Sequence, residues 1–286
     1  MRVTQSMLSN NMLRNLSNNY NKIGKLQDQL ATQKKITRPS DDPVVAMLGL
    51  SYRDNLNKVQ QFSRNISEAN NWLESTDDAI MQGVKVLHRV RELTVQASNG
   101  TYEETQRGAI AVEVEQLIEQ LETIAKTQVG GKYIFNGQNT NKAPTADNFS
   151  DGDIELEIFD EIKLKVNTKG TELFQSVFDT LDDLKDKLED ETASESDISS
   201  FLDKIDNEID HFLKIQADVG AKQNRVEMME DRLSSQEMIA TEIMSKNEDV
   251  EIEKVITDLI TQESVQRAAL SVGARIIQPS LIDFLR

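Results

Sequence analysis

Cysteine is absent from the 286-residue sequence, and proline, glycine and aromatic residues are scarce. Without thiols, the chain has no disulfide framework, no thiol nucleophile and no cysteine-based metal site. With only 4 prolines, 12 glycines and 5% aromatic residues, it has few helix breakers and few of the residues that favour sheets. This composition predicts long helices and little sheet.

Positive charge is also in short supply, because 32 lysines and arginines face 49 acids, for a net charge of −17. Such a chain suits neither nucleic acid phosphates nor an anionic membrane surface. No window approaches the roughly 18 apolar residues of a membrane span, and the first residues lack the apolar core of a cleavable signal peptide. We expect no nucleic acid and no membrane insertion, and a protein that is cytoplasmic or exported without a cleavable signal.

Two long stretches carry an apolar residue at every seventh position. One runs from 198 to 243 and the other from Pro43 to about Ser98. This spacing keeps a narrow apolar stripe on one side of a helix, and stripes of matching length predict an antiparallel pair. The predicted core positions are Tyr52, Val59, Ile66, Leu73, Ile80 and Leu87 in the first helix, and Ile205, Phe212, Val219, Val226 and Leu233 in the second.

The residues between the two stripes have a different character. Residues 132–137 are strand-like, and apolar residues alternate with charged ones from 154 to 166 around Asp160-Glu161, as in a hairpin with one buried face. A short amphipathic helix follows at 174–188. We therefore predict a mainly α fold, a long antiparallel helical coiled-coil rod with a small α+β, β-hairpin outer domain inserted between the long helices. The predicted domains are an N-terminal assembly arm at 1–42, a rod core at 43–131 and 191–248, an outer domain at 132–190 and a C-terminal assembly arm at 249–286.

Both ends of the sequence predict helices with incomplete apolar faces. Residues 1–36 form a weak amphipathic helix rich in asparagine, which competes with the helix through its own backbone. The run Arg38-Pro39-Ser40-Asp41-Asp42-Pro43 then breaks the helix, with Asp42 placed to cap the next one. After 249 two neighbouring apolar files appear, one of which includes Ile256, Ile260 and Leu270. A surface that wide implies contact with more than one neighbour.

No group of residues predicts catalysis or cofactor binding. The two histidines, His88 and His211, lie beside the apolar stripes, where a structural or solvated role is expected. Asp151, Asp153 and Glu155 have a cation-ligand spacing, but the glycine and distal glutamate of a calcium loop are missing. There is no phosphate loop or dinucleotide fingerprint. We expect no enzyme, no cofactor and no metal site.

Three segments resemble the flagellin superfamily. Residues 219–227 are similar to the GA-x-QNR-x-E signature of the flagellin C-terminal helix, and residues 266–285 resemble the flagellin terminus, which ends in Q-x-SLL-x-x-L. The bend at 36–43 occupies the place of the segment that precedes the long N-terminal helix. Its R-P-S-D-D-P form, residues 131–137 and the ending at 283–285 are closer to the hook-associated protein 3 branch of that superfamily.

The resemblance implies a structural subunit at the hook–filament junction of the bacterial flagellum, exported through the flagellar type III path. Its implied partners are further copies in a ring-like assembly, the first hook-associated protein, flagellin, the export machinery and an export chaperone. The alternatives are a flagellin filament subunit proper and, from the heptads alone, a cytoplasmic coiled-coil adaptor. The expected assembly interface consists of Leu16, Ile23, Leu30, Leu259, Ala269, Ile276, Leu281, Phe284 and Leu285.

Overall fold

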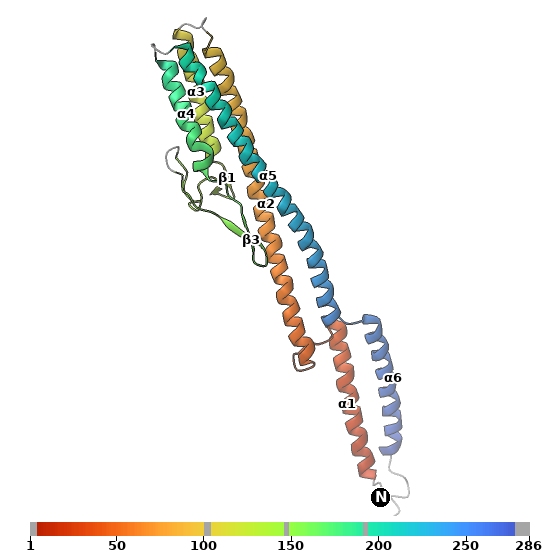
Figure 1. Cartoon of the computed structure of the whole chain (residues 1–286). Coiled ribbons are helices and arrows are strands. Elements are labelled where there is room, and N and C mark those ends of the chain that lie inside the picture. The colour runs from red at the N-terminus through yellow and green to blue at the C-terminus, as the bar shows by residue number, and fades with distance from the viewer. Residues whose placement is uncertain (1–4, 100–103, 146–148, 191–193, 278–286) are drawn as a thin grey trace, which may run out of the picture. The chain divides into compact units, whose positions relative to one another are not determined.

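Long helices dominate the computed structural model, which describes residues 5–99, 104–145, 149–190 and 194–277 (Figure 1). The α-helices are α1 (Gln5–Thr32), α2 (Pro43–Ala97), α3 (Glu104–Ala125), α4 (Ser176–Glu189), α5 (Glu195–Glu248) and α6 (Ile252–Ile277), and a short π-helix, η1 (Thr171–Gln175), leads into α4. The strands are β1 (Gln128–Val129), β2 (Lys132–Tyr133), β3 (Glu155–Phe159) and β4 (Ile162–Lys165), in two antiparallel pairs. The predicted mainly α fold with a small β part is confirmed. No helix of the described ranges is long and apolar enough to cross a membrane.

The two longest helices run antiparallel, as predicted. α2 has 55 residues and α5 has 54, so that each is about 80 Å long at about 1.5 Å per residue. Arg91 of α2 pairs with Asp206 at 2.5 Å, and the Asn70 amide donates a hydrogen bond to the Glu230 carboxylate at 3.2 Å. The later of these α2 residues pairs with the earlier residue of α5, as expected for antiparallel helices.

The chain divides into two compact units. The terminal unit comprises Met1–Lys58 and Glu237–Arg286, and the central unit comprises Val59–Gln236. The predicted arm boundaries at 42/43 and 248/249 lie inside the terminal unit. The division differs because the first turns of α2 and the last turns of α5 bond to the connections that lead to α1 and α6, as described below.

The central unit contains almost all of the buried apolar side chains. Phe212 is fully buried and lies against Gly83 of α2, where an added Cβ would come within 2.6 Å of the Phe212 ring. A glycine at this position therefore lets the two long helices approach each other around an aromatic ring. Of the predicted core positions, Tyr52 is half-buried and lies in the terminal unit, while the buried ones are Val59, Ile66, Leu73, Ile80, Leu87, Ile205, Phe212, Val219, Val226 and Leu233.

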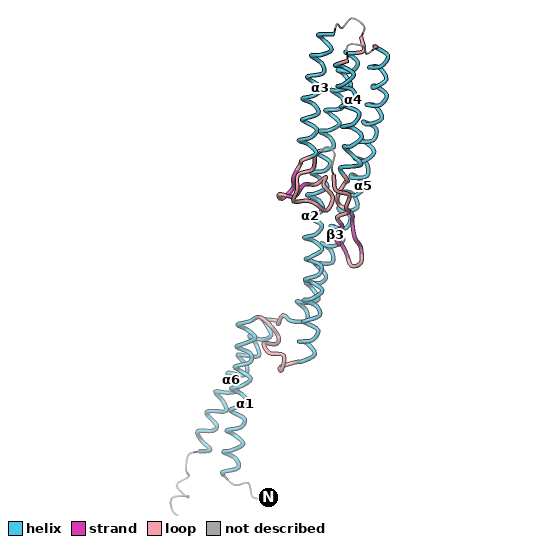
Figure 2. The backbone as a smooth tube through the Cα atoms, turned by 90° about the vertical axis from the view of Figure 1, so that its left-hand side faces the viewer, coloured by secondary structure: helices cyan, strands magenta, loops and turns pink. Residues whose placement is uncertain are grey.

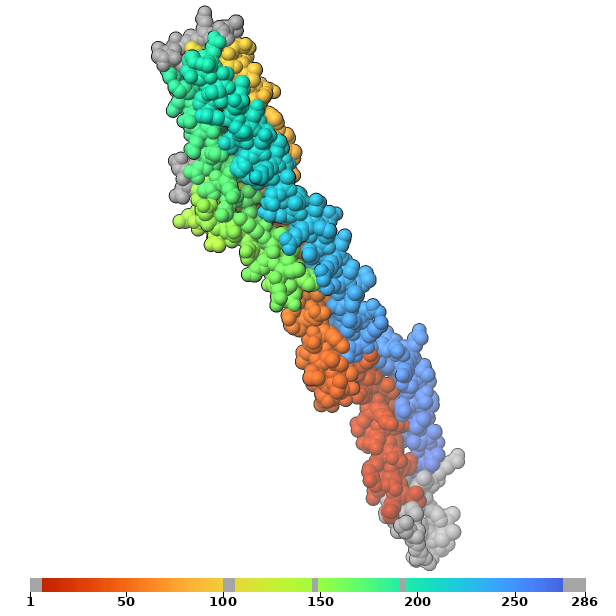
Figure 3. All heavy atoms as spheres, viewed as in Figure 1, coloured from red at the N-terminus to blue at the C-terminus, as the bar shows by residue number. Residues whose placement is uncertain are grey.

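Residues 132–190 share this core instead of forming a separate one. The Phe174 ring meets Phe212 edge-on at 5.8 Å and Phe135 edge-on at 5.0 Å, and α4 packs along α3. Figure 2 shows α2, α3, α4 and α5 side by side, and Figure 3 shows the green segment in contact with α5. A hairpin and one short amphipathic helix cannot bury their own apolar faces, so the predicted outer domain is continuous with the helical core.

The two hairpins differ in how far they follow the sequence pattern. β3 and β4 pair around Asp160-Glu161 as predicted, with Glu161 at a φ of 62°. Of the predicted strand at 132–137, only Lys132 and Tyr133 pair, and they do so with β1 across a turn of two glycines. The next residues turn away because the buried Asn136 amide donates to the carbonyls of Asn139 (3.1 Å) and Lys142 (3.0 Å).

Candidate assembly site in the terminal unit

The terminal unit exposes much of its apolar surface. Among its described residues, the buried apolar side chains are Ile23, Ala240 and Val255. Its exposed large apolar side chains are Met7, Leu8, Leu13, Tyr20, Val44, Met47, Leu48, Leu50, Met238, Ile239, Ile243, Ile252, Ile256, Ile260, Val265, Leu270 and Val272. In the described part of the central unit that set is shorter: Met81, Val95, Val112, Leu213 and Met228. Exposed apolar surface concentrated on one unit indicates an interaction site.

Helices α1 and α6 pack against each other and cover part of the predicted interface. Gly273 of α6 lies where an added Cβ would overlap the Met12 side chain of α1, so the two helices are in close contact. Ile23 is buried, and Leu16, Leu30, Leu259 and Ala269 are half-buried. The Ile276 side chain and residues Leu281, Phe284 and Leu285 lie outside the described residues. The apolar side chains left exposed are therefore mostly neighbours of the predicted ones.

The connection from α1 to α2 is bonded to the connection from α5 to α6. The Lys35 amide donates to the Glu248 carbonyl at 2.7 Å, and the Val250 amide donates to the Gln33 carbonyl at 3.1 Å. Lys34 and Asp249 thus form an isolated antiparallel bridge. Two backbone hydrogen bonds fix the register in which the chain leaves one helix pair and enters the next.

A buried carboxylate anchors this junction of the two connections. The Glu248 side chain is only 7% exposed, and its Oε2 lies 2.6 Å from Arg53 and 3.3 Å from Lys34. Lys34 also bonds Asp249 at 2.6 Å. Burial alone would raise the pKa of Glu248, but the hydrogen bonds from Arg53 and Lys34 outweigh it and the pKa is lowered. The same Lys34 bond lowers the pKa of Asp249.

Helix α2 is shaped to receive that carboxylate. A Cβ added to Gly49 would lie 2.8 Å from Glu248 Oε1, so a larger residue here would require the carboxylate to shift. At the start of α2, Asp42 Oδ1 accepts from the amides of Val44 (3.0 Å) and Val45 (3.2 Å). The cap follows the prediction, whereas the Glu248 network was not predicted. Its one signal in the sequence is the pair of acids at the break in the apolar pattern.

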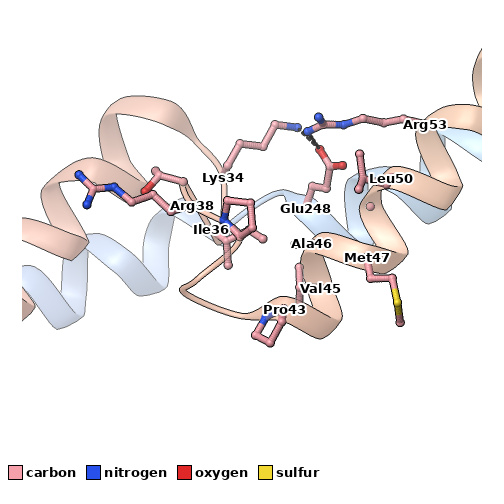
Figure 4. Close-up of a pocket in the computed structure, with 13 residues that line it drawn as sticks. Lys34, Ile36, Arg38, Pro43, Val45, Ala46, Met47, Leu50, Arg53 and Glu248 are labelled. Atoms are coloured by element: carbon pink, nitrogen blue, oxygen red, sulfur yellow. Dashed lines mark hydrogen bonds and ion pairs between the residues drawn. The ribbon is translucent and has the colours of Figure 1, made fainter.

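A pocket of about 390 Å³ opens beside the bend (Figure 4). Its charged lining residues are Lys34, Arg38, Arg53 and Glu248, and Figure 4 shows Lys34 and Arg53 converging on Glu248. The remaining lining residues are Ile36, Thr37, Pro39, Pro43, Val45, Ala46, Met47, Gly49 and Leu50. The bend thus forms a mainly apolar hollow with cationic groups at its edge.

The acids considered as cation ligands in the central unit have other partners. Asp153 pairs with Lys165 at 2.6 Å, which lowers the pKa of this aspartate. Glu155 lies 3.7 Å from Lys163, and the Asp151 carboxylate accepts from the Thr171 hydroxyl. The described ranges contain no group of three or more His, Cys, Asp or Glu that could hold a metal ion.

Two family models match the chain. The bacterial flagellin N-terminal helical region matches residues 3–140, and the bacterial flagellin C-terminal helical region matches residues 202–285. Together they cover well over half of the sequence. They include α1, α2, α3, most of α5 and α6, and so the whole of the bend.

The similar proteins are flagellar. Flagellar hook-associated protein 3 of Escherichia coli K12 is 24% identical, with 93% of each chain covered. The flagellar filament 41 kDa core protein of Borreliella burgdorferi is 38% identical over 40% of this chain, a match that spans 34% of that protein. The crystal structure of Bacillus cereus FlgL has a TM-score of 0.59 and 26% identity, and covers 68% of this chain and 99% of that one. The chain belongs to the flagellin superfamily.

Proposed function

We propose that this chain is the structural subunit that joins the hook to the filament of the bacterial flagellum. The single observation that carries the proposal is the terminal unit, in which paired helices α1 and α6 expose far more apolar surface than the central unit does. Exposed apolar surface of this extent typically marks a site that another chain covers. The family is one of structural flagellar proteins and is not an enzyme family.

Two further observations favour the junction over the filament itself. The R-P-S-D-D-P bend, which resembles the hook-associated branch, lies in the sequence between Lys34 and Arg53, the two residues that pair with Glu248. The second is the similarity in structure to Bacillus cereus FlgL, which is 26% identical and is covered over 99% of its length. Flagellins share the two terminal family models, so a filament subunit proper is the alternative that an experiment must separate.

The two functions differ in what the chain does alone. A filament subunit adds to copies of itself without limit, because its contacts form an open helix. A junction subunit stops after a turn or two and offers a surface on which a different protein continues. Its contact with the neighbouring protein must then be more favourable than unlimited self-addition.

The proposed partners follow from that position. They are further copies of the chain in a ring-like assembly, the first hook-associated protein on one side and flagellin on the other. The export machinery and an export chaperone would act before assembly, and the finished ring would be extracellular. The proposed contact residues are Leu16, Ile23, Leu30, Leu259, Ala269, Ile276, Leu281, Phe284 and Leu285, with the exposed apolar residues of α1 and α6 beside them.

The test has a genetic arm and a biochemical arm. Deleting the gene should leave hooks in place and release flagellin into the medium as unpolymerised monomer. Purified chain seeded with filament fragments should attach without growing long filaments. Long filaments grown from this chain alone would make it a filament subunit. A deletion strain with normal filaments would refute both functions.

Matched variants show whether the terminal unit carries the contacts. Ile256→Asp changes a 41% exposed residue of α6, and Met228→Asp changes a 65% exposed residue of α5 in the central unit. We expect the first variant to lose attachment to hooks and the second to keep it. Equal attachment by both variants would mean that α6 is not part of the interface.

A further inference from the structure

The pocket beside the bend has the size of a site for a few side chains. Its volume of about 390 Å³ is at the lower end of the roughly 300–1,000 Å³ of ligand pockets. Such a space holds two or three apolar side chains but not a whole helix. Its wall consists largely of aliphatic and proline side chains, among them Ile36, Pro39, Pro43, Val45 and Leu50.

Two wall residues are left largely uncovered. Met47 is 67% exposed and Leu50 is 68% exposed, although both belong to the pocket. Neighbouring Val44 is 60% exposed. A cluster of exposed apolar residues around a hollow is a typical anchor site for apolar side chains of a partner.

The edge of the pocket is cationic in a chain whose net charge is −17. Lys34, Arg38 and Arg53 line it together with a single carboxylate, Glu248. Glu248 already bonds Lys34 and Arg53, and no carboxylate of the described residues lies within ion-pair distance of Arg38. The fitting occupant is therefore a short apolar segment that carries an acid.

The sequence contains such a segment in Leu281-Ile282-Asp283-Phe284-Leu285, where four apolar residues surround one acid. The segment lies outside the described residues. It follows α6 in the sequence, and the start of α6 relative to the pocket is given by the structure. Helix α6 begins at Ile252, two residues after Val250 bonds Gln33 next to the pocket.

The chain's own segment cannot reach its own pocket. The 26 residues of α6 carry the chain about 39 Å along the helix axis, at about 1.5 Å per residue. The eight residues from 278 to 285 span at most about 29 Å when fully extended. An occupant made of residues 281–285 must therefore come from another molecule.

We propose that the pocket beside the bend binds residues 281–285 of a second copy of the chain. Two or three of the segment's apolar side chains fill the hollow, and Asp283 faces the cationic edge. This inference rests on the proposed function only in requiring that copies meet. It names the segment and the receiving site of one contact within the ring.

The absence of cysteine allows a direct test by disulfide formation. Purified Met47→Cys chain is mixed with tagged Leu285→Cys chain under mild oxidation, and the mixed dimer is measured on a non-reducing gel. The control is Met228→Cys, because Met228 is 65% exposed and Met47 is 67% exposed. We expect about tenfold more mixed dimer with Met47→Cys, because docking raises the local concentration of the partner thiol. Equal yields at the two positions would overturn the proposal.

Two additions test the pocket and the segment. A peptide of residues 278–286 should suppress the mixed dimer, and the same peptide with Phe284→Ser and Leu285→Ser should not. Adding Leu50→Glu to the Met47→Cys chain should remove the enrichment, while Leu213→Glu in the central unit should leave it. Enrichment that survives Leu50→Glu would place the occupant elsewhere.

A third measurement tests the second copy. A chain that carries both Met47→Cys and Leu285→Cys should form no disulfide within one molecule at high dilution, as judged by mass spectrometry of the digest. An intramolecular disulfide would contradict the reach of the chain and overturn the proposal. A Leu270→Cys partner that gives more mixed dimer than Leu285→Cys would assign the pocket to the face of α6 instead.

The failure of this inference is distinguishable from failure of the proposed function. The disulfide assay uses the purified chain and no hook. The gene deletion and the seeding assay do not depend on which segment fills the pocket. If the chain attaches to hooks but Met47→Cys and Leu285→Cys give no excess of mixed dimer, only the assignment of the pocket's occupant is refuted and the proposed function stands.

Discussion

The central and terminal units are built from the same kind of helix but are stabilised differently. The central unit buries long apolar stripes together with an aromatic cluster around Phe174 and Phe212. The terminal unit buries Ile23, Ala240 and Val255 among its described apolar residues, and relies on two backbone hydrogen bonds and the Glu248 ion network. Isolated helices of this kind are marginal in water, because most helix stability comes from packing of the apolar face.

The difference teaches that apolar periodicity alone does not say where burial occurs within one chain. A stripe in the central unit is covered by the chain's own helices, so that this unit is expected to be stable alone. A stripe in the terminal unit is only partly covered, so that full stability there requires another molecule. Four experiments test this contrast, beginning with the one that should have the largest effect.

Replacing Phe212 with aspartate should unfold the central unit. The side chain is fully buried against Gly83 of α2 and the Phe174 ring. Burying an unpaired carboxylate costs about 2–7 kcal/mol, against a total of about 5–15 kcal/mol for a domain. Thermal unfolding followed by circular dichroism measures the loss. The adjacent Leu213 is 45% exposed, so Leu213→Asp should unfold within a few degrees of the parent. Equal loss in both variants would contradict the burial contrast between these neighbours.

Adding one methyl group at Gly83 should also weaken the central unit. The new Cβ would lie 2.6 Å from the buried Phe212 ring, and overpacking of a core costs about 1–3 kcal/mol. Gly220 of α5 has nothing within 4 Å of an added Cβ. Gly220→Ala should instead stabilise the helix by up to about 1 kcal/mol. Denaturant unfolding measures the change in the free energy of unfolding for each variant, which should be a loss for Gly83→Ala and a gain for Gly220→Ala. A stabilised Gly83→Ala would disprove the close contact.

Protease should cut the terminal helices first. Local opening costs least where few apolar groups are buried, so sites in α1 and α6 should be cleaved well before sites in the central unit. Mass spectrometry over a digestion time course identifies the fragments, and the resistant one should approximate residues 59–236. The same digestion of hook-bound chain should show α1 and α6 protected. Equal cleavage rates in the free chain would remove the difference in stability between the units.

The smallest expected effect is acid weakening of the two backbone bonds at the connections. The pKa values of Glu248 and Asp249 are lowered by folding and that of Lys34 is raised. Lowered carboxylate pKa values stabilise the fold above the unfolded values of about 4 and lose that contribution as pH falls further. The raised lysine pKa favours the fold below about 10.4. The network is therefore complete between about pH 5 and 10.

Hydrogen exchange at the Lys35 and Val250 amides reads this network directly, because these amides make the two bonds. Protection factors should drop as the pH falls below about 4. Glu248→Gln should lower them at pH 7 by about fivefold, a modest effect because Lys34 and Arg53 are partly exposed. Glu242→Gln is the control, since Glu242 pairs with Lys246 on the surface of the same helix. Unchanged protection in Glu248→Gln would mean that the backbone bonds hold without the carboxylate.

The sequence predicted the helices well because their signals are local. Apolar residues at every seventh position predicted α2 and α5, and Asp42 with Pro43 placed the start of α2 at its observed residue. The hairpin around Asp160-Glu161 was also predicted, because its alternation of apolar and charged residues lies within about a dozen residues. Each of these features depends on neighbours that are close along the chain.

What the sequence could not predict depends on distant partners. Phe174 joins the core through Phe212, which is 38 positions away in the printed numbering, so residues 132–190 seemed a separate domain. Glu248 is buried because Gly49 and Arg53 receive it, and nothing near Glu248 in the sequence shows this. The interface on α1 and α6 stays a prediction, and which apolar residues stay exposed there depends on how α1 and α6 pack against each other.

The bridge between the two connections also affects the order in which the chain folds. Lys34 and Asp249 are 215 positions apart, so this contact closes nearly the whole chain into a loop. Contacts of such high sequence separation form late, because the entropy of closing the loop is lost before the contact stabilises anything. The hairpin and the α3–α4 pair close much shorter loops. The terminal unit should therefore complete its folding last, and the surface on which copies meet would arise only after both ends of the chain are present.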